Sequence, residues 1–93
     1  MAVLVRIPSQ LQTLTGGERE VKVSGSTVGA ILDELETSFP GFKERLLDEN
    51  GEVRRFVNIY VDEEDVRFKE GLSTKVEEGS EISIIPAVAG GSS

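Results

Sequence analysis

Two segments near the start of the chain alternate between apolar and other residues. Residues 3–7 read Val-Leu-Val-Arg-Ile, and residues 20–24 read Glu-Val-Lys-Val-Ser. Successive side chains of a strand point to opposite faces, so this period of two predicts a half-buried strand in each place. Gly16-Gly17 lies between them and is a turn signal, because glycine adopts positive φ without steric cost. We therefore expect an N-terminal β-hairpin.

A different period follows this hairpin. Thr27 is suited to be the N-cap of a helix, because its hydroxyl can accept from a backbone N–H of the first turn. Apolar residues then recur at the spacing of one helical face, and Pro40-Gly41 ends the pattern. A short second helical turn is expected around residues 42–47. The apolar face of the main helix comprises Val28, Ile31, Leu32, Leu35 and Phe39.

The second half of the chain predicts three further strands separated by turns. Residues 56–61 are aromatic or β-branched apart from Asn58, which favours a strand. The expected elements are a strand at 56–61, a turn at 62–64, a short strand at 66–68, a loop or single helical turn at 71–76, a turn at 78–80 and a strand at 81–85. The order β-β-α-β-β-β with one main helix predicts an α+β fold, in which the helix covers one sheet face and leaves the other exposed.

Two aliphatic residues do not fit the core of this sheet. If Ile82 and Ile84 point inward, Ile85 must point outward, and Leu4 is outward if its neighbours Val3 and Val5 are buried. An exposed apolar patch can be a contact for another protein, although single exposed aliphatics are ordinary. Leu4 and Ile85 are therefore candidates for a partner interface.

Length and composition restrict what this domain can do. The chain has 93 residues, which suits one small domain, and it contains no His and no Cys. Zinc fingers, Fe–S clusters, disulfides, thiol nucleophiles and Ser–His–Asp relays are thereby excluded. Ten Lys and Arg against seventeen Asp and Glu give a net charge of −7, which argues against nucleic-acid binding and favours partners with basic surfaces. Neither a signal peptide nor a membrane span is recognisable, so we expect a cytoplasmic protein.

No motif for intrinsic catalysis or for a cofactor is present. The acidic run 62–65 lacks the alternating spacing of a calcium loop and is better explained as a solvated turn. Nothing selects a catalytic pair among the seventeen acids, and Gly16-Gly17 lacks the surroundings of a phosphate loop. We expect no catalytic residue, no metal site and no bound cofactor.

The last residues of the chain form a second unusual feature. Small residues follow the final strand in the run 86–91, Pro-Ala-Val-Ala-Gly-Gly, before Ser92-Ser93. Such residues pack weakly, so we expect a flexible tail over 87–93 after a folded domain over 1–86. A thin tail of this kind could be a frayed terminus, or it could enter the active site of another protein.

Three segments together resemble the ubiquitin-like sulfur carriers of the ThiS/MoaD family. They are Phe-Val-Asn-Ile-Tyr-Val at 56–61, Glu-Asp-Val-Arg-Phe at 64–68 and Ile-Pro-Ala-Val-Ala-Gly-Gly at 85–91. Within the family they are most similar to the carriers that serve cysteine biosynthesis. The resemblance covers essentially the whole chain and implies a ubiquitin-like β-grasp, with a mixed sheet of four to five strands and one main helix on one face.

The resemblance also implies a chemistry for the tail. The Gly91 carboxylate would be adenylated by an E1-like enzyme with ATP and converted to a thiocarboxylate, Gly90 would give clearance for threading, and Ile85 would contact the activating enzyme. A PLP-dependent cysteine synthase would accept the sulfur, and a JAMM-type metallopeptidase would release the product. The carrier itself would be a monomer without enzymatic activity. The remaining tail residues are Ala87, Val88 and Ala89, and the weaker interface candidates are Leu4 and Arg6.

Ser92-Ser93 depart from the family pattern, because the reactive carboxylate is not free while they remain attached. If the two serines are native, a peptidase must cut between Gly91 and Ser92 before sulfur can be loaded; otherwise they are remnants of cloning. Sulfur supply for molybdopterin or thiamin synthesis, and attachment to other proteins as a modifier, stay open as alternatives. The net charge of −7 leads us to expect basic residues on the docking surface of the activating enzyme.

Overall fold

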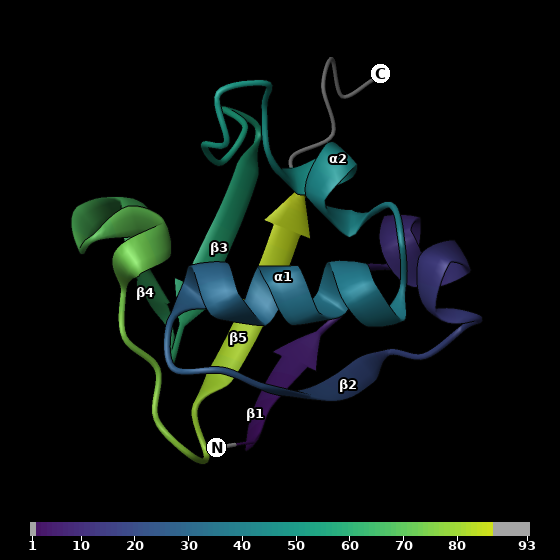
Figure 1. Cartoon of the computed structure of the whole chain (residues 1–93), viewed down its shortest axis with the longest axis horizontal. Helices are drawn as coiled ribbons and strands as arrows, with labels where there is room; N and C mark the ends of the chain where they lie inside the picture. Colours follow the sequence, from purple (N-terminus) through teal and green to yellow (C-terminus); the bar gives the residue numbers. More distant parts are fainter. Residues whose placement is uncertain (1, 87–93) are drawn as a thin grey trace.

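A computed structural model describes residues 2–86 of the chain, and Figure 1 shows the arrangement of its elements. The strands are β1 (Ala2–Arg6), β2 (Glu20–Ser24), β3 (Val57–Val61), β4 (Glu64–Asp65) and β5 (Glu81–Pro86). The α-helices are α1 (Val28–Ser38) and α2 (Phe42–Leu46), and the short 3-10 helices are η1 (Ser9–Thr15), η2 (Val66–Phe68) and η3 (Gly71–Ser73).

The five strands form one mixed sheet in the order β2-β1-β5-β3-β4. β1 and β2 are the predicted hairpin, with Val3 opposite Val23 and Val5 opposite Val21. β1 and β5 are parallel neighbours at the centre of the sheet, and β3 is antiparallel to β5. The predicted α+β fold is therefore confirmed, and its topology is that of the ubiquitin-like β-grasp.

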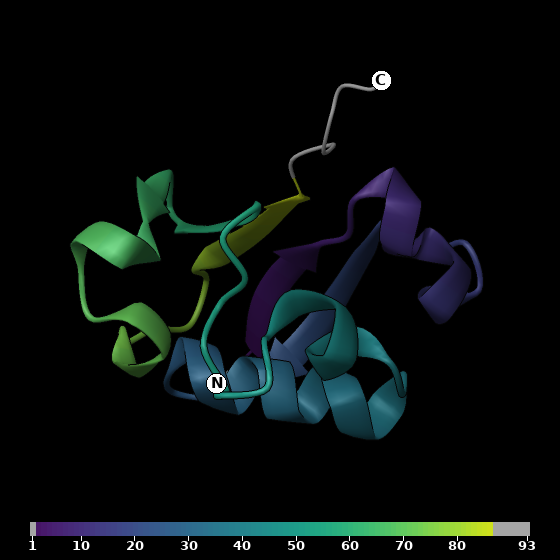
Figure 2. The same cartoon turned by 90° about the horizontal axis from the view of Figure 1, so that it is seen from above.

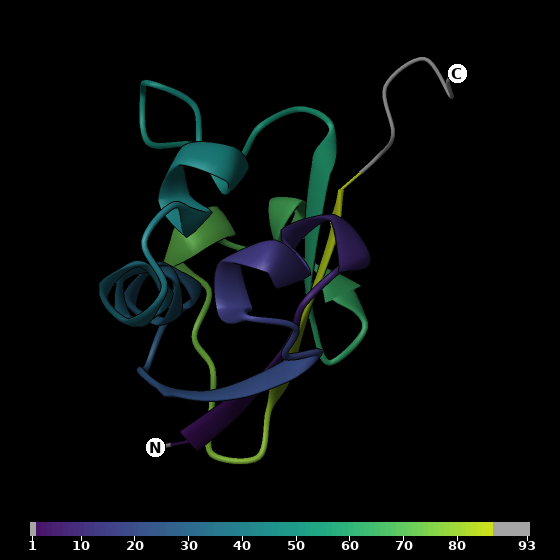
Figure 3. The ribbon, with the colours of Figure 1, turned by 90° about the vertical axis from the view of Figure 1, so that its right-hand side faces the viewer.

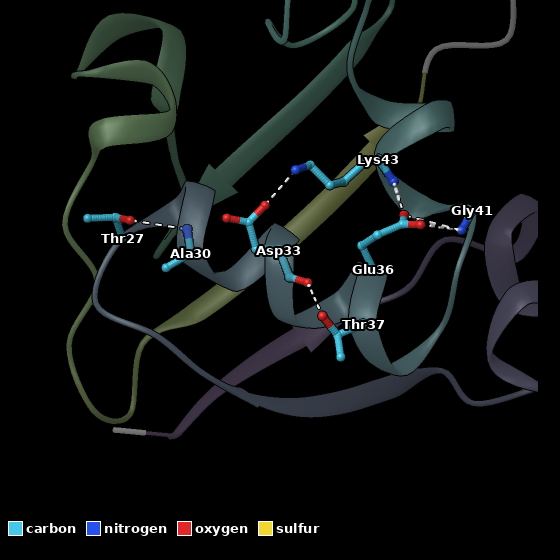
Figure 4. A network of polar contacts seen from close by, with 7 residues as sticks. All are labelled: Thr27, Ala30, Asp33, Glu36, Thr37, Gly41 and Lys43. Atoms are coloured by element: carbon cyan, nitrogen blue, oxygen red, sulfur yellow. Dashed lines mark hydrogen bonds and ion pairs between the residues drawn. The ribbon is translucent and has the colours of Figure 1, made fainter.

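The main helix begins and ends where the sequence predicts. The Thr27 hydroxyl accepts a hydrogen bond from the Ala30 N–H at 3.1 Å and caps α1, as Figure 4 shows. The helix ends at Ser38, and the following N–H of Phe39 donates to the Leu35 carbonyl at 2.6 Å. An N-cap of this kind supplies one of the hydrogen bonds that the first helical turn lacks.

The core lies between the helices and one face of the sheet. Figures 2 and 3 show α1 and α2 on the same side of the strands, with the other face of β1, β3 and β5 left uncovered by helices. The helices contribute Val28, Ile31, Leu32, Leu35, Phe42 and Leu46 to the buried core, and the sheet contributes Val3, Val5, Val57, Ile59, Val61, Ile82 and Ile84. Burying these aliphatic and aromatic side chains supplies most of the driving force for folding.

The predicted strand at 66–68 is wrong. The strand of this hairpin is Glu64–Asp65, and residues 66–68 form the 3-10 helix η2. The Asp65 Oδ1 accepts from the Arg67 N–H at 2.8 Å and caps this turn, while Val66 is completely buried. The local cap therefore outweighs the strand propensity of Val66 and Phe68.

Two remaining expectations concern the tail and membranes. Residues 87–93, including the expected reactive glycine, lie outside the residues that the structure describes. Among residues 2–86, no helix is both long enough and apolar enough to cross a membrane.

Candidate functional site

The uncovered face of the sheet holds the residues that the sequence proposed as an interface. Ile84 and Ile85 are adjacent in β5, yet Ile84 is 3% exposed and Ile85 is 48% exposed. This difference confirms that Ile85 points away from the core, as the alternation predicted. Leu4 is partly buried.

Arg6 lies on the same outer face and forms ion pairs there. Its guanidinium donates to the Glu81 carboxylate of the neighbouring strand β5, and Glu20 of β2 lies 3.9 Å from it. The hydrogen bond and the charge of Glu81 raise the pKa of Arg6 above its usual value, with a smaller contribution from Glu20. Arg6 therefore links three strands across the sheet surface.

The register separates the two apolar candidates. Leu4 lies opposite Glu81, and Ile85 follows Glu81 by four residues along β5. Four residues of a strand span about 13 Å, and Arg6 and Ser83, which lie opposite each other, occupy the same outer face between Leu4 and Ile85. The structure therefore does not bring Leu4 and Ile85 together in one patch. Their role as partner contacts stays a prediction.

The outer-face neighbour of Ile85 is Asn58 on β3. Asn58 Oδ1 accepts from the Arg67 guanidinium at 2.7 Å, and the same guanidinium donates to the carbonyl groups of Arg54 and Arg55. We call this set of bonds the Arg67 clasp. It ties η2 to the segment that leads into β3, and it places Arg67 and Ile85 on opposite sides of Asn58.

Sequence reasoning missed two exposed aromatic residues beside this clasp. Phe56 precedes β3 and is 48% exposed, and Phe68 follows Arg67 and is 88% exposed. The alternation of β3 could have placed Phe56 outward with Asn58, because Val57 and Ile59 are the buried positions. No signal in the sequence indicated Phe68, because its exposure depends on the turn that replaced the expected strand.

The acidic run lies in a hairpin, as predicted: Asp62 and Glu63 form the turn, and Glu64–Asp65 are strand β4. Asp62 and Glu63 both have positive φ, of 50° and 76°, and Asp62 Oδ1 accepts from the Glu81 N–H at 3.0 Å. Residues 2–86 contain no group of three or more carboxylates arranged to hold a metal ion. The run therefore has a structural explanation in the turn between β3 and β4.

A shallow hollow of about 360 Å³ lies between the turn at 51–53 and the two short helices η2 and η3. Its charged lining residues are Glu52 and Arg67, and Arg67 is already bonded to Asn58. It contains none of the residues that the sequence proposed for a function. Its lining is Gly51, Glu52, Val53, Val66, Arg67, Gly71 and Leu72.

The expected tail contacts and processing site, Ala87 to Ser92, cannot be placed, because they lie outside the described residues. The structure does place the end of β5, where Pro86 lies opposite Val57 of β3. The chain therefore leaves the fold beside Phe56 and Ile85. This end of the sheet is the candidate site, and it comprises Arg55, Phe56, Asn58, Arg67 and Ile85. The Arg54 guanidinium instead donates to the Glu44 carbonyl of α2 at 3.1 Å.

The fold and this site define a small ubiquitin-like β-grasp protein with an exposed sheet face at the exit of its C-terminal segment. The chain belongs to the ThiS family, whose model matches residues 5–91. The sulfur carrier protein CysO of Mycobacterium tuberculosis is 50% identical over 93 residues, which covers 98% of this chain and all of the relative.

Two further comparisons agree with this assignment. The crystal structure of the BexX/CysO complex of Amycolatopsis orientalis contains a chain that superposes with a TM-score of 0.91 at 48% identity, covering 96% of this chain and 99% of that chain. The small archaeal modifier protein 3 of Haloferax volcanii is 38% identical over 66 residues, which covers 71% of each chain.

Proposed function

We propose that this protein is a sulfur carrier whose reactive group is the carboxylate of Gly91. The observation that carries the proposal is the similarity to CysO, which extends over 98% of the chain at 50% identity. The family match ends at Gly91, so it includes Gly90-Gly91 and excludes the two serines. The sulfur carried on Gly91 serves cysteine biosynthesis, which is the pathway that the resemblance to carriers of the CysO type implies.

The chemistry needs activation because a carboxylate is a poor electrophile. A Gly91 carboxylate oxygen attacks the α-phosphorus of ATP on an E1-like enzyme, and pyrophosphate leaves. A sulfur nucleophile then attacks the carbonyl carbon of the acyl-adenylate, a C–S bond forms, and AMP leaves with its oxygen. The product is a thiocarboxylate in which sulfur replaces one oxygen of Gly91.

The carrier brings its C-terminus to the enzyme and supplies no catalytic group. Gly91 follows Pro86, the last residue of β5, by five residues. Five extended residues reach at most about 17 Å, so Gly91 can enter an active site while the sheet remains outside it. Ala87, Val88, Ala89 and Gly90 are small or aliphatic and would pass through a narrow channel. Ile85 lies where this channel would meet the sheet.

The proposed partners follow from the chemistry before and after loading. An E1-like adenylating enzyme loads the sulfur, and a PLP-dependent cysteine synthase accepts it from the thiocarboxylate. A JAMM-type metallopeptidase then releases the cysteine. The protein acts as a monomer in the cytoplasm, where ATP is available, and it is not itself an enzyme.

Ser92-Ser93 require a processing step in this scheme. A peptidase, for which the JAMM-type enzyme is the candidate, hydrolyses the bond between Gly91 and Ser92 and frees the Gly91 carboxylate. Until that cut, the carrier is an inactive precursor.

Intact-mass measurement tests the proposal. The chain is incubated with its E1-like enzyme, the peptidase, ATP and sulfide. We expect loss of both serines and then a gain equal to the mass difference between sulfur and oxygen. A variant that ends at Gly91 should gain the same mass without the peptidase, and a chain that ends at Gly90 should not. An unchanged mass of the Gly91-terminated chain beside an active enzyme would contradict the proposal.

Protein modification is the second candidate, and the similarity to small archaeal modifier protein 3 favours it. In that case the Gly91 acyl group would be transferred to a lysine amine instead of to sulfur. Isopeptide-linked adducts that disappear when Gly91 is deleted would support modification. Supply of sulfur for molybdopterin or thiamin synthesis differs only in the acceptor, and assays with each purified synthase distinguish these pathways.

A further inference from the structure

The chain contains two asparagines, and their surroundings differ. Asn50 precedes Gly51 in the exposed turn between α2 and β3, which Figure 3 shows as the teal loop that projects from the ribbon. Asn58 lies in β3 before Ile59, and its Oδ1 accepts from the Arg67 guanidinium at 2.7 Å. Among residues 2–86, the Asn50 side-chain amide makes no hydrogen bond, and its backbone N–H makes one. The Asn50 side chain is therefore free to rotate, whereas that of Asn58 is held.

An asparagine followed by glycine can lose its side-chain amide without an enzyme. The backbone nitrogen of the glycine gives up its proton to water and attacks the side-chain carbonyl carbon Cγ of the asparagine. A C–N bond forms, ammonia leaves, and the product is a five-membered succinimide. Water then opens the ring at one of its two carbonyl groups and leaves either aspartate or isoaspartate. In isoaspartate the main chain runs through the side-chain carboxyl carbon.

Gly51 meets the steric requirement of this attack. A glycine has no Cβ that would keep its nitrogen away from the preceding side chain. A β-branched residue such as Ile59, which follows Asn58, is stiff and obstructs the same approach. No atom outside the neighbouring residues lies within 4 Å of the position that a Cβ of Gly51 would take. The turn around Gly51 therefore has open space in which to change its shape.

Hydrogen bonds to Asp48 hold this turn closed. The Gly51 N–H donates to the Asp48 carbonyl at 3.0 Å, so the attacking nitrogen is engaged while the turn is intact. Asp48 Oδ1 accepts from the N–H groups of Asn50 at 2.9 Å and Glu52 at 3.0 Å. The turn must open locally before Gly51 can react, and the Asp48 side chain controls how often it opens.

We propose that Asn50 is a site of spontaneous deamidation in the folded protein, and that the Asp48 side chain sets the rate of the reaction. The exposed Asn50-Gly51 pair supplies both reacting groups, and water is the co-reactant. Asn58 is excluded by its bond to Arg67 and by the side chain of Ile59. The inference goes beyond the proposed function, because it involves neither Gly91 nor a partner enzyme.

The isoaspartate product should loosen the turn. It adds one methylene group to the main chain between residues 50 and 51, inside a loop that the β-bridge between Leu47 and Val53 closes. The longer chain displaces the Glu52 N–H from the Asp48 carboxylate. We therefore expect faster amide hydrogen exchange at Gly51 and Glu52 in the isoaspartate form, measured by NMR, with little change in the sheet.

Peptide mapping by mass spectrometry tests the proposal on the full chain. The folded protein is kept at physiological temperature in mildly alkaline buffer and digested with trypsin at intervals. Cleavage after arginine places Asn50 in the peptide 46–54 and Asn58 in the peptide 56–67. We expect the first peptide to gain the mass difference between a hydroxyl and an amino group and to separate into an aspartate and an isoaspartate peak. The second peptide should keep its mass.

Three variants separate the two parts of the proposal, after thermal unfolding has confirmed that each is folded. Asp48→Ala should speed the mass gain several-fold, because it removes the acceptor of the Asn50 and Glu52 N–H groups. Glu49→Ala is the matched control, because it removes a neighbouring carboxylate that makes no hydrogen bond among the described residues, and it should change the rate much less. Asn50→Gln should abolish the mass gain, because its longer side chain would have to form a six-membered ring.

An unchanged mass of the peptide 46–54 in the original chain would overturn the proposal. Conversion of Asn58 at the same rate as Asn50 would also overturn it, because both residues would then react through global unfolding. Equal rates in Asp48→Ala and Glu49→Ala would overturn the role of the Asp48 side chain and leave Asn50 as the reacting residue.

Discussion

The carboxylate of Glu36 in α1 accepts a hydrogen bond from the backbone N–H of Lys43 in α2, at 3.0 Å. It also accepts from the N–H of Gly41 at 3.2 Å, as Figure 4 shows. Gly41 has a φ of 113°, so the chain turns sharply between the two helices. One side chain of the first helix thus satisfies the N–H groups at the start of the second.

Glu36→Gln should make stability less dependent on pH. The bonds from Lys43 and then Gly41 lower the pKa of Glu36 below its ordinary value of 4.5. A lowered pKa means that the carboxylate stabilises the fold fully above the unfolded-state pKa, and that this contribution is lost as pH falls through the folded-state pKa. Urea unfolding as a function of pH should show a difference between the two proteins that is largest near neutral pH and small in acid. Glu34→Gln, on the exposed side of α1, is the control and should show little difference.

Alanine substitutions at Ile84 and Ile85 should separate an effect on stability from an effect on partner binding. Ile84 is buried, so Ile84→Ala should lower the free energy of unfolding by about 2–5 kcal/mol. Ile85 is half exposed, so Ile85→Ala should change it by no more than about 0.5–1 kcal/mol, while weakening binding to the activating enzyme. Chemical denaturation and calorimetric binding check the two effects. Equal losses of stability would mean that Ile85 is also a core residue.

Glu63→Gly should stabilise the hairpin between β3 and β4. Glu63 has a φ of 76°, a conformation that costs a residue with a Cβ about 1 kcal/mol and that glycine adopts freely. We expect the melting temperature to rise by a few degrees, on the order of 4 °C. Asp62→Gly is the comparison, because it removes the hydrogen bond from the Glu81 N–H to Asp62 and should not stabilise. A lower melting temperature for Glu63→Gly would show that this side chain makes a compensating contact.

Arg67→Met should loosen the segment that leads into β3. The variant keeps much of the aliphatic side chain but loses the donors to Asn58 and to the carbonyl groups of Arg54 and Arg55. We expect a loss of about 1–2 kcal/mol and faster amide hydrogen exchange near residues 54–58, measured by NMR. Arg67→Lys should restore little, because an ammonium group cannot reproduce the planar fork of a guanidinium. Unchanged exchange in both variants would show that the clasp does not hold this segment.

The order of the main elements was predictable because their patterns are local. The alternation in β1 and β2 and the apolar face of α1 each follow from the geometry of a single element. The outward position of Ile85 also followed from alternation within β5 alone. The prediction of a strand at 66–68 is wrong because the Asp65 side chain caps a 3-10 turn there. Strand propensity describes each residue singly and does not include this side-chain hydrogen bond.

The sequence by itself determined the α+β class, the absence of His and Cys chemistry, and the outward direction of Ile85. Only the tertiary structure decided that Leu4 and Ile85 lie apart, because strand register depends on which strands pair and in which direction. It also decided that the Arg67 guanidinium reaches the backbone carbonyl groups of Arg54 and Arg55. No local pattern predicts this contact, because it joins residues that are 12 and 13 positions apart in the chain.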